Sequence, residues 1–293
     1  MKNNSAKWEQ HPDVRIVTQQ LPQDLATRYL KYTPKSGRSD RPALVLVHGI
    51  ARRARDHLRE YLPWAIETGT TLLAPIFDST RFRGYQRLGA SNASLSAADA
   101  LSALLDHETA SGRAWLFGFS GGAQFAHRYC LIEPQRIDAA AIVAAGWYTM
   151  PTSALGFPYG LGRGQLPSRH RVQLGDFLQI PKVVLVGSLD TDHDESLRSN
   201  QRIDTWQGNN RLARATAWVA ALDRASKRCG AASNTALTVL PNINHNWRRC
   251  YREGRLAERV TGFFDQTAHS RDSVSAISTA VSSPSITAVE MAR

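Results

Sequence analysis

The stretch LFGFSGGA, residues 116–123, holds one serine between glycines in a G-x-S-x-G pattern. An apolar run that suits a buried strand leads into it, and a helix-like segment, residues 123–131, follows it. Strand, sharp turn and helix together are the context in which this pattern lifts a serine hydroxyl out of a sheet. Gly118 and Gly122 lack a Cβ, so strand and helix can approach closely there. The pattern therefore predicts a nucleophile, Ser120, at the turn.

Strand-like and helix-like runs alternate along the rest of the chain. Eight apolar runs are predicted as strands: residues 14–18, 26–32, 42–47, 70–76, 114–117, 139–145, 181–186 and 235–240. Apolar residues at helical spacing predict helices over residues 55–68, 94–109, 123–131, 211–228 and 256–267. This alternation predicts an α/β fold: a mostly parallel eight-stranded sheet with helices on both faces.

The composition is that of a globular protein with a sizeable core. Of the 293 residues, 42% are hydrophobic and 21% are charged. This length suits one large α/β domain, which we expect over residues 1–269. The irregular segment 152–177 is too short for a large lid domain. Residues 270–293 are rich in Ser, Thr and Ala and have no aromatic residue, which predicts a disordered tail.

The net charge at pH 7 is +11. It fits attraction to anionic partners such as nucleic acid, a membrane surface or acidic substrates, or a solubilising surface of scattered arginines. The densest clusters are Arg52, Arg53 and Arg55, and then Arg248 and Arg249. Neither cluster reaches the run of five to eight basic residues typical of a nucleic-acid patch. The solubilising surface is therefore favoured, and no nucleic-acid partner is expected.

Cysteine usage and targeting signals point to an ordinary cytoplasmic protein. Cys130, Cys229 and Cys250 give an odd count without metal spacing, although a bridge between the last two stays open. The first twelve residues are polar and lack the apolar core of a signal peptide. No run of about 18 apolar residues occurs, so no membrane partner is expected.

Two further polar residues follow predicted strands. Asp190 comes three residues after Gly187, which ends one strand, and His245 follows the last strand. Ligand and active sites of open α/β sheets lie at the carboxyl ends of the strands, where these residues would meet Ser120. Imidazole can take the serine proton, and a carboxylate fixes the imidazole tautomer. The order Ser, Asp, His along the chain is the one expected of an α/β-hydrolase.

Several carboxylates lie close together in the sequence around the expected acidic partner. Asp192 is an alternative to Asp190 as the triad acid. The run from Asp190 also begins like a calcium-binding loop, but Glu195 replaces the required glycine and Gln201 the final glutamate. We therefore expect Asp190 in the triad and no metal site.

The whole pattern resembles the α/β-hydrolase family of serine hydrolases. The matching pieces are Val47-His48-Gly49, Gly118 to Gly122, Gly187 to Asp190, and Asn244-His245. Within the family, the chain looks most like small bacterial esterases related to poly(3-hydroxybutyrate) depolymerases and feruloyl esterases. The resemblance implies that Ser120 is the nucleophile, that His245 is the base and that Asp190 is the acid. It also implies an oxyanion hole made by the backbone N–H groups of Gly121 and Ile50, and no cofactor.

Four aromatic residues near these positions are candidates for substrate binding. Phe119 precedes the nucleophile, Trp247 follows the base, and Trp147 and Tyr148 follow another strand. The last two would equally suit packing at a strand end.

The expected activity is hydrolysis of a small-molecule carboxylic ester through an acyl-enzyme. The alternatives are a thioesterase, lactonase, amidase or peptidase on the same triad, or a non-catalytic binding protein of the same fold.

Overall fold

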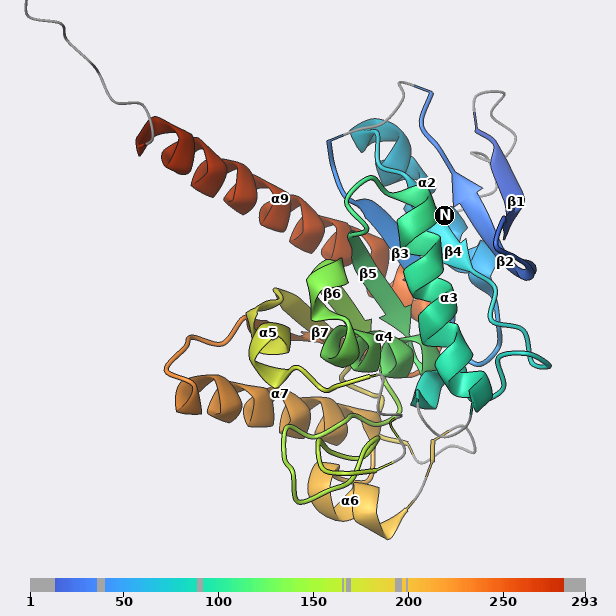
Figure 1. Cartoon of the computed structure of the whole chain (residues 1–293). Helices are drawn as coiled ribbons and strands as arrows, with labels where there is room; N and C mark the ends of the chain where they lie inside the picture. Colours follow the sequence, from blue (N-terminus) through green and yellow to red (C-terminus); the bar gives the residue numbers. More distant parts are fainter. Residues whose placement is uncertain are drawn as a thin grey trace, which may run out of the picture.

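The computed structural model describes residues 14–35, 40–88, 92–164, 166, 170–192, 197–198 and 200–281, without side chains for 92–96 and 271–281. One eight-stranded sheet runs through the molecule in the order β1-β2-β4-β3-β5-β6-β7-β8 (Figure 1). Its strands are β1 Ile16–Leu21, β2 Asp24–Tyr32, β3 Ala43–Val47, β4 Leu72–Pro75, β5 Ala114–Phe119, β6 Ile137–Val143, β7 Lys182–Gly187 and β8 Thr235–Leu240.

The pairing directions confirm the predicted mostly parallel sheet. From β4 through β3, β5, β6 and β7 to β8, every neighbouring pair is parallel. The antiparallel pairs lie at one edge of the sheet, where β2 pairs in antiparallel fashion with both β1 and β4. In the registers, Val47 pairs with Gly118 and Gly187 pairs with Leu240. The last residues of the strands therefore lie along the same edge of the sheet.

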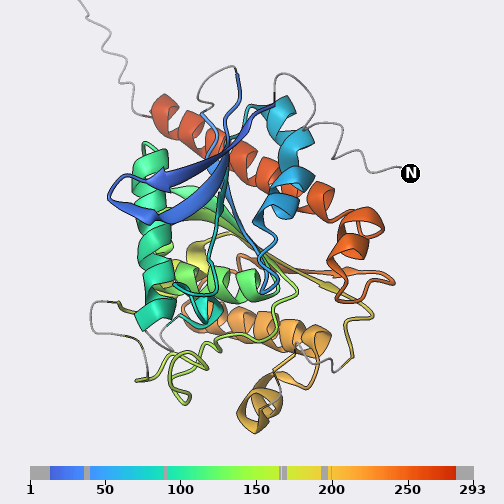
Figure 2. The same cartoon turned by 90° about the vertical axis from the view of Figure 1, so that its right-hand side faces the viewer.

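Helices cover both faces, as the sequence predicts. Alternate residues of each central strand point to opposite sides and form two separate hydrophobic clusters. Helices α3 Asn92–Glu108, α4 Gly121–Ile132, α5 Leu174–Gln179 and α7 Arg211–Arg228 pack into one cluster. Helices α2 Ala54–Thr68, α8 Trp247–Arg252 and α9 Leu256–Val281 pack into the other (Figure 2). Strands β3, β4 and β5 are buried at every residue, which explains their unbroken apolar sequences.

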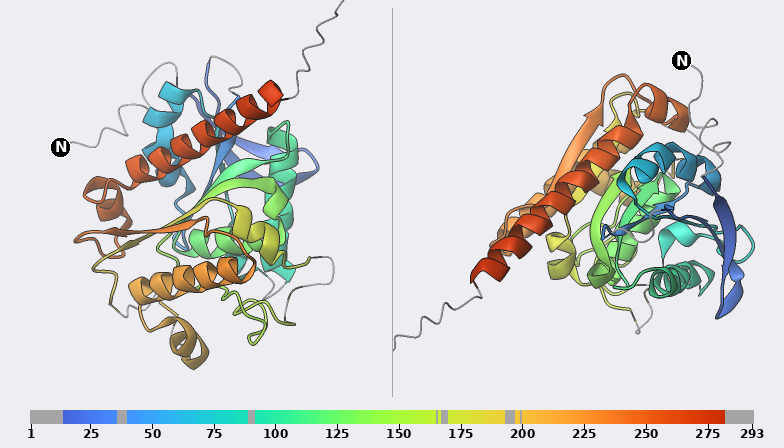
Figure 3. Two further views of the ribbon diagram at one scale, coloured as in Figure 1. Left: turned by 90° about the vertical axis from the view of Figure 1, so that its left-hand side faces the viewer. Right: turned by 90° about the horizontal axis from the view of Figure 1, so that it is seen from above.

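Two helical segments differ from the sequence prediction. The last helix continues past residue 267 to Val281 and projects beyond the sheet (Figure 3), so the first part of the predicted tail is helical. The remainder, 282–293, lies outside the described residues. A short helix, α6 Gln201–Gln207, begins at Asn200, whose side chain accepts a hydrogen bond from the Arg202 N–H.

Two sequence expectations concern a disulfide bridge and membrane-spanning helices. Cys130, Cys229 and Cys250 are all free thiols, so the open possibility of a bridge between the last two is not realised. In the part of the chain that the structure describes, no helix combines the length and the hydropathy required to cross a membrane.

Candidate active site

Ser120 occupies a strained turn between β5 and α4. Its backbone has φ 53° and ψ −112°, a conformation that non-glycine residues rarely adopt. A Cβ on Gly118 would lie 2.3 Å from the Gly122 carbonyl oxygen, and one on Gly122 would lie 2.2 Å from the Val47 carbonyl oxygen. Glycine is therefore required at both positions, because the turn at Ser120, which we call the serine elbow, closely approaches α4 and β3.

A continuous chain of hydrogen bonds joins the three residues that the sequence analysis singled out. Ser120 Oγ lies 3.1 Å from His245 Nε2, and His245 Nδ1 lies 2.9 Å from Asp190 Oδ2. Asp190 is only 2% exposed, whereas Asp192 is exposed. The structure thus brings Asp190, rather than Asp192, to the imidazole. Residues 193–196, which include Asp194 and Glu195 of the calcium-loop alternative, lie outside the described residues.

A buried arginine holds the other oxygen of the same carboxylate. Arg211, the first residue of α7, is 1% exposed, and its Nη1 lies 3.3 Å from Asp190 Oδ1. The backbone N–H of Leu212 also donates to the Asp190 carbonyl oxygen at 3.2 Å. The N-terminus of α7 therefore fixes the loop that carries the carboxylate. The sequence analysis did not assign Arg211 to the site, because helical spacing does not reveal which loop a helix start approaches.

The backbone nitrogens proposed for the oxyanion hole lie next to each other. A Cβ built on Gly121 would be 3.2 Å from the Ile50 nitrogen, and one on Gly49 would be 3.3 Å from the Phe119 carbonyl oxygen. The loop after β3 is therefore pressed against the serine elbow. Gly121 and Ile50, the two residues expected to form the oxyanion hole, lie where these two segments meet.

His48 holds that loop in position through both of its ring nitrogens. Nε2 accepts a hydrogen bond from the Phe77 N–H at 3.1 Å, and Nδ1 lies 2.8 Å from the Gly49 carbonyl oxygen. The Tyr85 hydroxyl donates to the His48 carbonyl oxygen at 2.6 Å. Burial lowers the pKa of His48 to about 4, so the ring is neutral, with one donor and one acceptor as these bonds require.

A cavity of about 180 Å³ opens at the nucleophile. Its walls are Gly49, Ile50, Ala51, Arg53, His57, Phe119, Ser120, His245 and Trp247. Phe119 stacks on the ring of His245 with centroids 5.6 Å apart. Two of the four aromatic residues predicted to bind substrate, Phe119 and Trp247, therefore do line the cavity.

The other two, Trp147 and Tyr148, lie in the packed interior instead. Trp147 is 2% exposed and stacks on Tyr159, and Tyr148 is fully buried and stacks on Trp218. The prediction that these residues line the substrate cavity is therefore corrected, since the polypeptide turns inward after β6 and packs both rings against α7 and the following loop.

His57 is a cavity residue that the sequence analysis missed. It comes from α2, is 4% exposed, and its Nδ1 lies 3.0 Å from the Tyr251 hydroxyl. Burial lowers its pKa to about 3, helped by the nearby charge of Arg53. A helical position far from any strand end carries no sequence signal for such a role.

Among the described residues, no group of three or more His, Cys, Asp or Glu side chains is arranged to hold a metal ion. The site is therefore built from a serine, an imidazole, a carboxylate and backbone N–H groups. That combination can activate a hydroxyl nucleophile and stabilise an oxyanion.

No protein-family model matches the chain, and no curated protein matches its sequence. Many solved structures do resemble it, and several of them are hydrolases. Poly(aspartic acid) hydrolase-1 from Sphingomonas sp. KT-1 matches with a TM-score of 0.67 and 23% identity, over 80% of this chain and 94% of that one. LpqC, a poly(3-hydroxybutyrate) depolymerase from Bordetella parapertussis, matches with a TM-score of 0.66 and 26% identity, over 86% and 92%. Naproxen esterase from Bacillus subtilis matches with a TM-score of 0.51 and 14% identity, over 86% and 92%.

Proposed function

The chain has the α/β-hydrolase fold, and on that premise we propose that it cleaves carboxylic esters through an acyl-enzyme on Ser120. The observation that supports this most directly is the hydrogen-bonded path of 3.1 Å from Ser120 to His245 and 2.9 Å from His245 to Asp190. A serine hydroxyl is a weak nucleophile, and such a path is what activates it.

In the first half of the reaction, His245 Nε2 accepts the Ser120 proton while Oγ attacks the ester carbonyl carbon. The carbonyl oxygen becomes an oxyanion, which the N–H groups of Gly121 and Ile50 stabilise. Loss of one such donor typically costs about 10²–10³ in rate. Asp190 stabilises the imidazolium that forms beside it.

Collapse of this intermediate breaks the bond to the leaving oxygen, which takes the proton from His245 and departs as the alcohol. In the second half, His245 removes a proton from water, and the resulting hydroxide attacks the acyl carbon on Ser120. A second oxyanion forms in the same hole. Its collapse releases the carboxylic acid and returns the proton to Ser120.

The dimensions of the cavity favour a small substrate. Its volume of about 180 Å³ is below the roughly 300–1,000 Å³ typical of drug-sized ligand pockets. A short acyl group suits this space. Thioesters, lactones and amides would follow the same steps, because the triad determines acyl transfer and the cavity determines the substrate.

A substrate panel tests the proposal. We expect turnover of p-nitrophenyl esters that is highest for acetate to butyrate and falls for longer acyl chains, with thioester, lactone and anilide analogues assayed alongside. Ser120→Ala is the matched control, because it removes one oxygen and should abolish turnover. Faster cleavage of another acyl class than of any ester would replace the ester assignment, and residual turnover in the control would refute the acyl-enzyme route.

A further inference from the structure

The cavity at the nucleophile has a guanidinium in its wall. Arg53, directly before α2, lines the cavity together with Ser120 and the oxyanion loop. Its charge is close enough to the interior to lower the pKa of His57, although burial is the main cause of that shift. Its side chain is 47% exposed, and its carboxylate contact with Asp56 is long, at 3.7 Å. The guanidinium therefore keeps donors available for an anion in the cavity.

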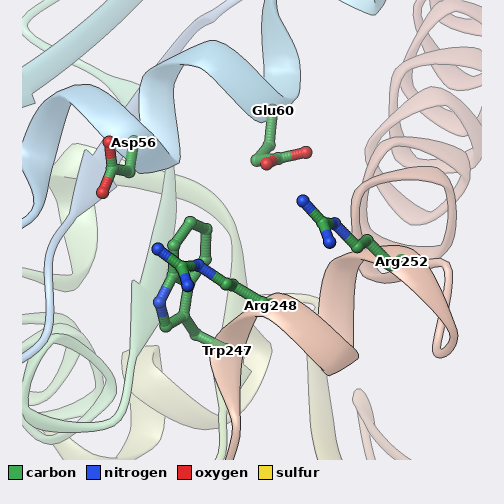
Figure 4. Close-up of a pocket in the computed structure, with 5 residues that line it drawn as sticks. All are labelled: Asp56, Glu60, Trp247, Arg248 and Arg252. Carbon is green, nitrogen blue, oxygen red and sulfur yellow. The ribbon is translucent and has the colours of Figure 1, made fainter. Parts of the chain in front are cut away.

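A second guanidinium, that of Arg248, lies near the same indole ring, that of Trp247. The centre of the Arg53 guanidinium lies 5.8 Å from the Trp247 ring centre, and that of Arg248 lies 5.7 Å from it. Figure 4 shows Arg248 lying over the indole ring, in a second cavity of about 360 Å³ that shares Trp247 with the first. The indole ring thus lies within cation–π distance of two arginine side chains, and Trp247 lines both cavities.

The nearby carboxylates have arginine neighbours of their own. Asp56 also faces Arg59, at 3.8 Å. Glu60 faces Arg252, whose charge partly offsets the effect of burial on the Glu60 pKa, and Figure 4 shows this guanidinium directed toward Glu60.

Arg248 is placed differently. Among the described residues, it makes no ion pair with a carboxylate. The two cavities that share Trp247 therefore each have a guanidinium beside this ring, in a chain whose net charge is +11.

From this arrangement we propose that Arg53 and Arg248 form a carboxylate-binding subsite, and that the acyl group of the substrate carries a free carboxylate. The inference rests on the proposed ester hydrolase function. Because Arg53 and Ser120 share one small cavity, the carboxylate lies only a few atoms from the scissile carbonyl. The substrate class is thus the monoester of a short dicarboxylic acid. Arginine suits this role because its planar fork of N–H donors matches a carboxylate.

A matched pair of esters tests the subsite. Mono-p-nitrophenyl succinate and p-nitrophenyl butyrate have the same leaving group and acyl chain length, and only the first carries a carboxylate. The quantity to measure is the ratio of kcat/KM for succinate to that for butyrate. We expect this ratio to exceed one at about 20 mM salt and to fall severalfold at about 500 mM, where charges are screened.

Variants then locate the effect. Arg53→Gln and Arg248→Gln should each lower the ratio, with about a tenfold loss for the first, as expected for a charge-assisted hydrogen bond. Arg53→Lys should retain more of the ratio, because it keeps the charge and loses only the fork. The control is Arg224→Gln, an exposed position on α7 with the same change in net charge, which should leave the ratio unaltered.

The outcomes separate the two proposals. A ratio that neither Arg53→Gln nor Arg248→Gln changes, or that Arg224→Gln lowers equally, would overturn the subsite while the ester hydrolase stands. Absence of turnover of both esters by the unaltered protein would overturn the hydrolase proposal, and the subsite with it.

Discussion

Substitution of Arg211 should show how much the stability of the protein depends on its buried ion pair with Asp190, the carboxylate that contacts the His245 ring. Arg211 and Asp190 are 1% and 2% exposed, and their nearest nitrogen and oxygen are 3.3 Å apart. Arg211→Met keeps much of the apolar stem but leaves the carboxylate buried without its cation. Asp190→Asn removes the carboxylate charge that faces the Arg211 guanidinium. The double substitution removes both charges.

The geometry sets the size of the effect. At 3.3 Å and an effective dielectric of about 20, the attraction is about 5 kcal/mol, which desolvation of both groups largely opposes. Breaking a buried pair from one side typically costs about 3–5 kcal/mol, whereas removing both partners can be nearly neutral. We therefore expect each single substitution to lower the free energy of unfolding by about 3 kcal/mol. The double substitution should lose at least about 2 kcal/mol less than the sum of the two.

Urea denaturation of the four proteins at pH 7, followed by tryptophan fluorescence, measures this coupling free energy. The matched control is Arg224→Met, which places the same residue change on an exposed site of α7 and should alter stability by no more than about 0.5 kcal/mol. Losses that add within about 0.5 kcal/mol would refute the account of a coupled ion pair.

Three further outcomes follow from the same structure. Gly122→Ala should lower the free energy of unfolding by about 1–3 kcal/mol or more, because the new Cβ would lie 2.2 Å from the Val47 carbonyl oxygen. Gly175→Ala is the control, because a Cβ there would have nothing within 4 Å, and thermal denaturation compares the two variants. The pKa values of His48 and His57, about 4 and about 3, lie below the unfolded value of 6.5, so unfolding takes up protons and stability should fall as pH drops from 6.5 toward 4. Denaturant midpoints that stay constant across this window would contradict that assignment. Asp192→Asn should leave kcat/KM near the original value, because that side chain is exposed, whereas loss of the buried triad carboxylate should cost about 10⁴; a large loss at the exposed position would move the acid role there.

The fold was predictable from the apolar runs that form the strands, and the three central side chains were predictable because each comes directly after such a run. Buried parallel strands have unbroken apolar sequences, and their carboxyl ends share one edge. Ser120, Asp190 and His245 each follow such a run, so their meeting could be expected before any distance was known. The sequence favoured Asp190 and left Asp192 as the alternative; in the structure, Asp190 Oδ2 lies 2.9 Å from His245 Nδ1, and Asp192 is exposed.

The rest of the site depends on packing, which leaves no local signal. His57 and Arg211 reach the site from helices, where a polar residue on a half-buried face is equally compatible with solvent. Trp147 follows a strand as the triad residues do, yet it packs inward on Tyr159. The helical course of residues 270–281 could not be predicted from their composition, because serine favours turns and helix caps over helix interiors.

Covalent labelling with a fluorophosphonate tests the central claim most directly, because this reagent reacts with a serine hydroxyl only where a base activates it. Peptide mass spectrometry of the labelled protein should find one adduct, on Ser120. Labelling should be absent in Ser120→Ala and strongly slowed in His245→Ala, with both variants folded by circular dichroism. A folded, unaltered protein that takes no label, or that takes it on another serine, would contradict the assignment of this site as a catalytic centre.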